Sequence, residues 1–156
     1  GHLQAVMPFD NRVVLVSIAG TKLKQMLEIG TSGAHGPLQI SGGTLITTKG
    51  EGVSRDLNND GDENNWERNR LCSAHVGGMP INPSKQYTIA TTDFLLGGGD
   101  HLELAFRGST LLETGPLLRD HLVTWFSAQD PCVSPPENAL KRLQTDNCTP
   151  MEHKQQ

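Results

Sequence analysis

Residues Tyr87–Asp100 read YTIATTDFLLGGGD and are the most informative part of the chain. The first half alternates apolar with small or polar residues, which predicts a half-buried strand. The strand runs into Phe94, three glycines and Asp100. Glycines let a backbone approach a ligand, a phenyl ring offers a flat face to a planar base, and a carboxylate accepts hydrogen bonds from two ribose hydroxyls. A Gly-rich turn that carries a Phe and an Asp by chance explains this segment alone at least as well.

Two earlier segments extend the pattern. Met7–Asn11 reads MPFDN and precedes the apolar run VVLVSI, and Leu38–Gly43 reads LQISGG. In this order and at this spacing, the three segments together resemble the C-terminal domain of the 5'-nucleotidase family. This family includes periplasmic UDP-sugar hydrolases and surface-anchored nucleotidases. The resemblance extends from about Leu3 to about Phe126. A single motif is weakly specific, whereas three in order are strongly specific.

The resemblance implies roles for five residues. In the family the base lies between two Phe rings, which match Phe9 and Phe94 here. The Asn of the PF-x-N segment touches the base and matches Asn11. The Gly after a Ser packs close to the base and matches Gly42, and the Asp that ends the Gly run holds the ribose hydroxyls and matches Asp100.

The phosphate-binding segment and the catalytic domain of such an enzyme are not found in this sequence. The family places an Asn-Ala-Gly-Gly-x-Arg segment and a two-metal phosphoesterase domain upstream of the PF-x-N strand. Two-metal hydrolysis needs clustered His and carboxylate ligands, but the six histidines are scattered along the chain. We therefore expect the substrate-recognition domain of a metallophosphoesterase, inactive alone. We expect the catalytic divalent metals in an N-terminal domain of the same polypeptide.

A second constellation is independent of the family match. Asp56–Glu67 reads DLNNDGDENNWE and matches the twelve-residue EF-hand calcium loop, with Gly61 at the turn position. Calcium prefers six to eight oxygen ligands, which such a loop supplies. The expected ligands are Asp56, Asn58, Asp60, Asp62 through its backbone carbonyl, Asn64 and Glu67.

The flanks of this loop differ from those of a true EF-hand. Gly50 and Gly52 precede the loop and disfavour an entering helix. The pattern favours a solitary calcium loop, inserted at residues 56–67, that caps a hairpin inside the domain. A solvated Asp/Asn-rich turn, common between strands, is the alternative.

Composition is typical of a single globular domain, expected at residues 1–127, followed by a Pro-rich tail at 128–156. The net charge of −4 and the lack of a Lys/Arg cluster argue against nucleic-acid binding. No apolar run approaches the length of a membrane span. The tail is expected to hold at most one short helix, Glu137–Gln144.

Three cysteines leave the disulfide state open. Cys72 falls in a predicted strand and is expected to be a buried thiol. Cys132 and Cys148 flank a tail segment, and either a bridge between them or two free thiols fits the sequence. A bridge implies an oxidising compartment, and calcium at extracellular concentrations points the same way. The expected location is therefore the periplasm or the cell exterior.

Hydrophobic periodicity predicts an α+β fold, with helices packed on the face of a mixed sheet. The run of Val, Leu and Ile from Arg12 predicts a fully buried strand. The expected strands are Arg12–Ile18, Leu38–Ile40, Thr44–Thr47, Arg70–Val76 and Tyr87–Thr92, and the expected helices are Gly20–Ile29 and Leu117–Ser127.

Three functions remain open. The first is nucleoside recognition, of base and ribose, for a 5'-nucleotidase-like hydrolase. The second is the same role in a relative that acts on UDP-sugars or cyclic nucleotides. The third is a non-enzymatic module in which calcium rigidifies a surface for a protein partner. The five matched residues favour the first two.

Overall fold

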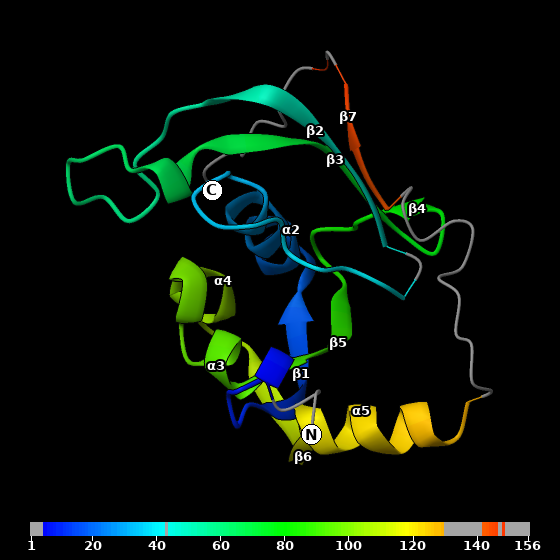
Figure 1. The fold of residues 1–156 in the computed structure, drawn as a ribbon. Helices are drawn as coiled ribbons and strands as arrows, with labels where there is room; N and C mark the ends of the chain where they lie inside the picture. The colour runs from blue at the N-terminus through cyan, green and yellow to red at the C-terminus, as the bar shows by residue number, and fades with distance from the viewer. Residues whose placement is uncertain (1–4, 43, 130–141, 147, 149–156) are drawn as a thin grey trace.

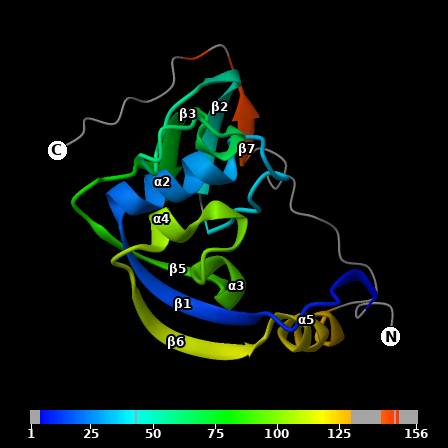
Figure 2. The ribbon, with the colours of Figure 1, turned by 90° about the vertical axis from the view of Figure 1, so that its left-hand side faces the viewer.

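Two β-sheets enclose a layer of helices in the computed structural model, which describes residues 5–42, 44–129, 142–146 and 148 (Figures 1 and 2). One sheet has the strand order β5-β1-β6 and the other β4-β3-β2-β7. The predicted α+β class is confirmed. The expected mixed sheet is also confirmed, because the second of the two sheets contains a parallel pair, and an antiparallel sheet is present in addition.

The first sheet is antiparallel and is built around β1 (Arg12–Ala19). Its neighbours are β5 (Gln86–Thr92) and β6 (Thr110–Leu117). Alternate residues of β1 are buried, namely Val14, Val16 and Ile18, whereas those between them are half-buried. The continuous apolar run therefore has one fully buried face instead of the two that we expected.

The second sheet is centred on the hairpin of β2 (Thr44–Val53) and β3 (Asn69–Val76). The two-residue strand β4 (Met79–Pro80) pairs with β3, and β7 (Leu143–Thr145) pairs in parallel with β2. The expected strand Leu38–Ile40 is not formed.

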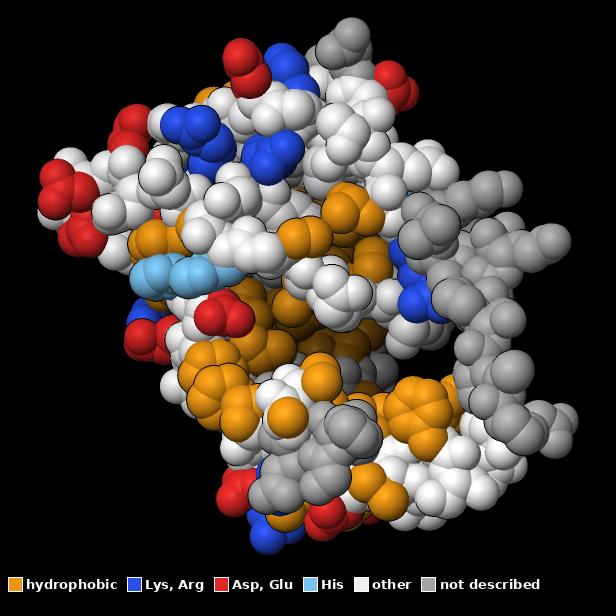
Figure 3. Space-filling view, in the orientation of Figure 1, with side chains coloured by type: hydrophobic (Ala, Val, Ile, Leu, Met, Phe, Trp, Pro, Cys, Tyr) orange, Lys and Arg blue, Asp and Glu red, His pale blue; other side chains and the backbone are white. Residues whose placement is uncertain are grey.

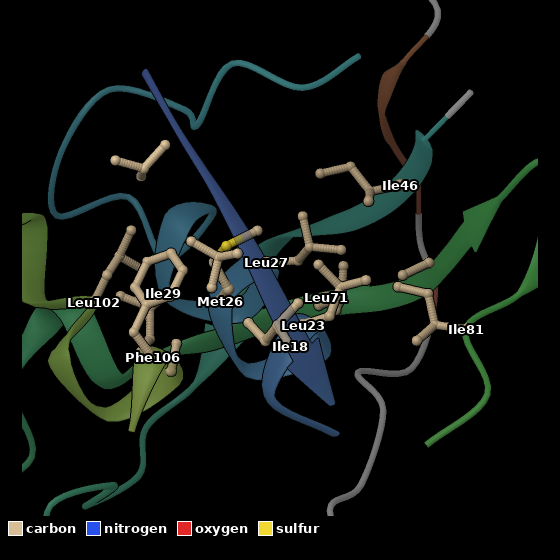
Figure 4. Close-up of a cluster of buried hydrophobic side chains, with 14 residues drawn as sticks. Ile18, Leu23, Met26, Leu27, Ile29, Ile46, Leu71, Ile81, Leu102 and Phe106 are labelled. Carbon is tan, nitrogen blue, oxygen red and sulfur yellow. The ribbon is translucent and has the colours of Figure 1, made fainter. Parts of the chain in front are cut away.

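Helix α2 (Gly20–Gly30) lies between the two sheets and supplies much of the core. Its predicted apolar face is confirmed, because Leu23, Met26 and Leu27 are buried. Two four-residue helices, α3 (Asp93–Leu96) and α4 (Glu103–Phe106), follow β5. Figure 4 shows how side chains from both sheets and from the helix layer meet in one cluster. Its labelled members are Ile18, Leu23, Met26, Leu27, Ile29, Ile46, Leu71, Ile81, Leu102 and Phe106.

The predicted C-terminal helix is confirmed as α5 (Leu118–Ser127), but none of its residues is buried. Val123, Trp125 and Phe126 are all exposed by more than two fifths, at 49%, 43% and 51%. None of the helices in the described part of the chain has the length and apolar character needed to cross a bilayer.

The cysteine pairing differs from both alternatives that the sequence left open. Cys72 of β3 forms a disulfide with Cys148, with their Cα atoms 5.9 Å apart. The expected buried thiol at Cys72 is therefore wrong, as is a Cys132–Cys148 bridge. The reason is the parallel pairing of β7 with β2, which brings the chain after β7 beside the hairpin. Cys132 lies outside the described residues.

The C-terminal residues that the structure describes join the second sheet. Most of the expected helix Glu137–Gln144 lies outside the described residues, and its last two positions, Leu143 and Gln144, belong to β7. The Arg142 guanidinium donates to the carbonyl of Ile40 at 2.9 Å. These contacts attach this part of the tail to the domain.

Candidate functional site

Antiparallel pairing of β1 with β5 brings two of the three motif segments to one end of the first sheet. Val13 lies opposite Thr92, and the backbone N–H of Arg12 donates to the Asp93 carboxylate at 2.9 Å. Phe9 and Asn11 precede β1, and Phe94 follows β5, so all three lie at this end. The segments are far apart in sequence, and the register of the sheet is what unites them.

The loop that carries Phe9 and Asn11 is held by α5. Asp10, between them, pairs with the Arg119 guanidinium at 2.8 Å, and the carbonyl of Asn11 accepts from the N–H of Leu118 at 2.8 Å. Phe9 itself is 74% exposed. The loop is therefore anchored through its neighbours while its ring remains accessible.

Phe94 packs against the glycine run that follows it. The Thr92 hydroxyl caps α3 by accepting from the N–H of Leu95 at 3.3 Å. A Cβ placed on Gly99 would overlap the Phe94 ring, so glycine at this position leaves the space that the ring occupies. Phe94 is still 50% exposed. One side of the ring contacts backbone, and much of the rest can receive a planar ligand.

Asp100 and Gly42 both line an apolar cavity of about 720 Å³. The cavity lies between β5, α2 and the loop at residues 35–42, and hydrophobic side chains surround a hollow at the centre of Figure 3. Gly42 has φ +68°, and a Cβ there would meet nothing. Among the described residues, none donates a hydrogen bond to the exposed Asp100 carboxylate. The structure therefore brings Gly42 and Asp100 together at one cavity, whereas Phe9, Asn11 and Phe94 do not line it.

A stack of three rings adjoins Asp100, and sequence reasoning did not predict it. The ring of His101, in the short 3-10 helix Gly99–His101, stacks on Trp66 at 4.9 Å and on His35 at 5.4 Å. In Figure 3 the histidine side chains form a band at the edge of the hollow. The three residues are separated by tens of positions and follow no spacing rule, so no sequence signal was available.

The predicted calcium loop, Asp56–Glu67, connects β2 to β3, as expected for a hairpin cap. The two Asp56 carboxylate oxygens accept from the N–H groups of Asp60 at 3.1 Å and Gly61 at 2.9 Å. The Asn58 amide donates to the Asp60 carboxylate at 2.7 Å. Gly61 has φ +93°, which supplies the turn that the sixth position of the loop requires.

Glu67 closes the loop from its other end and is only 1% exposed. One carboxylate oxygen accepts from the N–H groups of Leu57 at 2.7 Å and Asn58 at 3.2 Å, and the other accepts from Asn64 at 2.8 Å. Backbone N–H groups thus occupy the carboxylate expected to be the bidentate ligand. In the described parts of the chain, no three His, Cys, Asp or Glu side chains are arranged around one metal position.

The donor chemistry of the loop still suits calcium, because the side chains offer only oxygen acceptors. A hydrogen bond from the Asp62 backbone, and then one from the Asn58 amide, hold the pKa of the Asp60 carboxyl below its ordinary value. Asp60 is therefore ionised at neutral pH. The side chains of Asp62 and Asn64 are exposed.

Comparison with known proteins supplies the family. The family described as "5'-nucleotidase, C-terminal domain" matches residues 1–106. This chain therefore belongs to the 5'-nucleotidase C-terminal domain family. Among curated proteins, no sequence matches it.

Solved structures confirm the fold. A 5'-nucleotidase precursor from Thermus thermophilus superposes with a TM-score of 0.73 at 19% identity, over 94% of this chain and 27% of that one. A Staphylococcus aureus protein described as a 5'-nucleotidase, in complex with alpha-ketoglutarate, gives 0.65 at 15% identity, over 92% and 29%. The Thermus thermophilus sulfate thiohydrolase SoxB, in complex with glycerol, gives 0.52 at 17% identity, over 90% and 23%. The chain thus spans less than a third of the length of each of these proteins.

Proposed function

We propose that this chain recognises the nucleoside part of a nucleotide on behalf of a 5'-nucleotidase-like metallophosphoesterase. The base lies between Phe9 and Phe94, with Asn11 and the Gly42 backbone at its edge. The Asp100 carboxylate accepts hydrogen bonds from the ribose hydroxyls. Catalytic metals and phosphate contacts belong to a phosphoesterase domain of the same polypeptide, and the low coverage of the structural relatives supports this division of labour.

One observation carries the proposal: two exposed phenyl rings flank the paired ends of β1 and β5, and an exposed carboxylate at the neighbouring cavity follows the second ring by six residues. Phe9 and Phe94 are 74% and 50% exposed, although the chain has only four Phe residues with which to build a core. Exposed large apolar side chains gathered at one place are typical of ligand sites. Asp100, six residues after Phe94, adds the charged acceptor that a diol needs.

The expected affinity follows from adding these contacts. Each ring stacked on a base contributes about 1–3 kcal/mol, by analogy with single-stranded nucleic-acid complexes. A hydrogen bond to the Asp100 charge contributes about 1.5–3 kcal/mol. Association itself costs at least ~4 kcal/mol. Binding should therefore be weak, with a Kd of about 1 mM. The phosphate adds little, so adenosine and AMP should bind alike.

Chemical-shift titration of the chain with adenosine tests the proposal. We expect shifts at Phe94 and along Gly97–Asp100, weaker shifts with 2'-deoxyadenosine, and loss of binding in Phe94→Ala with the fold retained. Trp125→Ala, which removes an exposed ring from α5, is the matched control and should bind normally. If adenosine shifts nothing at about ten times the expected Kd, or if Phe94→Ala unfolds the domain, the nucleoside pocket is refuted.

We further propose that Asp56–Glu67 binds one calcium ion and that the protein works in the periplasm or outside the cell. The all-oxygen donor set and the turn at Gly61 support the calcium site. The disulfide Cys72–Cys148 supports an oxidising compartment. Melting in EDTA and in millimolar calcium tests the site. Saturation at about 100 times Kd adds about 2.7 kcal/mol to the free energy of unfolding, and an unchanged melting temperature refutes it.

A further inference from the structure

The backbone beside the proposed ribose contact adopts a conformation that its residues disfavour. Asp100 has φ +55° and ψ +34°, and His101 has φ +63°. Asp and His adopt the left-handed region more readily than most residues other than glycine, but they do so as single residues, so two in succession require that their surroundings hold them. Leu102, 1% exposed, fixes the chain on one side. The left-handed conformation of His101 requires a further contact, one that holds its side chain.

The ring of His101 is held by the three-ring stack of Trp66, His101 and His35. Trp66 lies nearly parallel to His101, with an angle of 9° between the planes, and His35 stacks on it at 30°. Trp66 comes from the loop between β2 and β3, and it is followed by the buried Glu67. His35 comes from the loop after α2. The histidine ring is thereby tied to two well-separated parts of the chain.

We propose that Trp66 and His35 are positioning residues for the ribose contact of the nucleoside site. By holding the His101 ring, they keep the adjoining Asp100 backbone left-handed, which places its exposed carboxylate at the cavity. This inference rests on the proposed function, because it concerns the sugar contact of that same site. Loss of the ring stack should affect the sugar contact and not the base contact, because Phe94 is held by its own helix cap and by Gly99.

The first experiment replaces Trp66 and measures binding of AMP and of its 2',3'-dideoxy analogue by chemical-shift titration. Trp66→Ala should weaken AMP binding about 10-fold or more, the value of a hydrogen bond to a charged group. It should leave the dideoxy analogue unaffected, because that ligand lacks the hydroxyls. Trp66→Phe keeps a stacked ring and should restore AMP binding. Trp125→Ala removes the only other Trp and serves as the control.

A double-mutant cycle isolates the route of the effect. If Trp66 acts through Asp100, then Trp66→Ala combined with Asp100→Ala should bind AMP no more weakly than Asp100→Ala alone. A second pair of variants approaches the stack from the other side, should Trp66→Ala fail to fold. His101→Ala and His101→Phe both keep a Cβ at the left-handed position, but only His101→Phe keeps a ring, so it alone should bind AMP normally.

The outcomes distinguish this inference from the proposed function. Positive φ gives a strong Hα–HN NOE within the residue, and this signal at Asp100 should fade in Trp66→Ala even without ligand. If Asp100→Ala weakens AMP binding but Trp66→Ala and His101→Ala do not, the positioning role is overturned and the nucleoside site stands. If Asp100→Ala has no effect, the ribose contact fails and the positioning role fails with it. Equal losses for AMP and the dideoxy analogue in Trp66→Ala would also overturn it.

Discussion

Removing the disulfide should produce the largest single loss of stability. The bridge joins Cys72 of β3 to Cys148, beyond β7, across a sequence separation of 76 residues. A cross-link restricts the unfolded chain more as its loop grows, and the chain-entropy expression gives about 4.5 kcal/mol for a loop of this length at 25 °C. Domains of this size have total unfolding free energies of about 5–15 kcal/mol. Reduction should therefore remove a large fraction of the free energy of unfolding.

The assay is urea unfolding with and without dithiothreitol, in a Cys132→Ser background so that the third thiol cannot exchange into the bridge. We expect the free energy of unfolding to fall on reduction, and Cys72→Ala with Cys148→Ala to give the same value under both conditions. Peptide mapping by mass spectrometry of the oxidised wild type should recover the Cys72–Cys148 linkage. A Cys132–Cys148 linkage in the map, or a free energy of unfolding that reduction leaves unchanged, would refute the reasoning.

Three further predictions concern the two candidate sites and their support. Gly99→Ala should displace the adjacent phenyl ring and weaken nucleoside binding by about 1–3 kcal/mol in a chemical-shift titration, whereas Gly97→Ala, at φ −73°, should bind normally. Asp60→Asn should reduce the calcium-induced rise in melting temperature and leave the melt in EDTA nearly unchanged, because the side chain is exposed; equal calcium shifts in the two proteins would contradict this. Arg55→Met should lower the free energy of unfolding by about 3 kcal/mol, because Glu28 is 1% exposed and pairs with Arg55 at 2.9 Å. Adding Glu28→Leu should recover much of that loss, and a neutral single variant in urea unfolding would contradict the ion pair's role.

The elements that the sequence predicted are those with a long and regular hydrophobic period. Strand β1 and helix α2 were predicted within one residue of their observed ends, because each presents a repeated apolar pattern to the core. Strand β6, TLLETGPL, was not predicted, since it lacks alternation and contains Gly115 and Pro116. Helices α3 and α4 have four residues each, which is too short for a helical period to register.

A local sequence pattern does not predict which distant segments of the chain come into contact. The division into two sheets depends on which strands pair, and hydrophobic alternation says nothing about partners. The disulfide depends on β7 lying parallel to β2, a pairing of residues about a hundred positions apart. Cys72 looked like an ordinary buried thiol because its own strand gives no sign of that neighbour.

The nucleoside and calcium motifs look independent in the sequence, but in the structure they adjoin. Trp66 lies one residue before Glu67, whose carboxylate holds three backbone N–H groups of the calcium loop. The same Trp66 stacks on His101, which follows Asp100. If the proposals above hold, a cation that draws Glu67 away from those N–H groups should also affect Trp66, the residue that we propose supports the ribose contact. For this reason Glu67→Gln should disturb the folding of the loop together with the proposed calcium binding, and the exposed Asp60 is the position at which the proposed calcium binding can be tested alone.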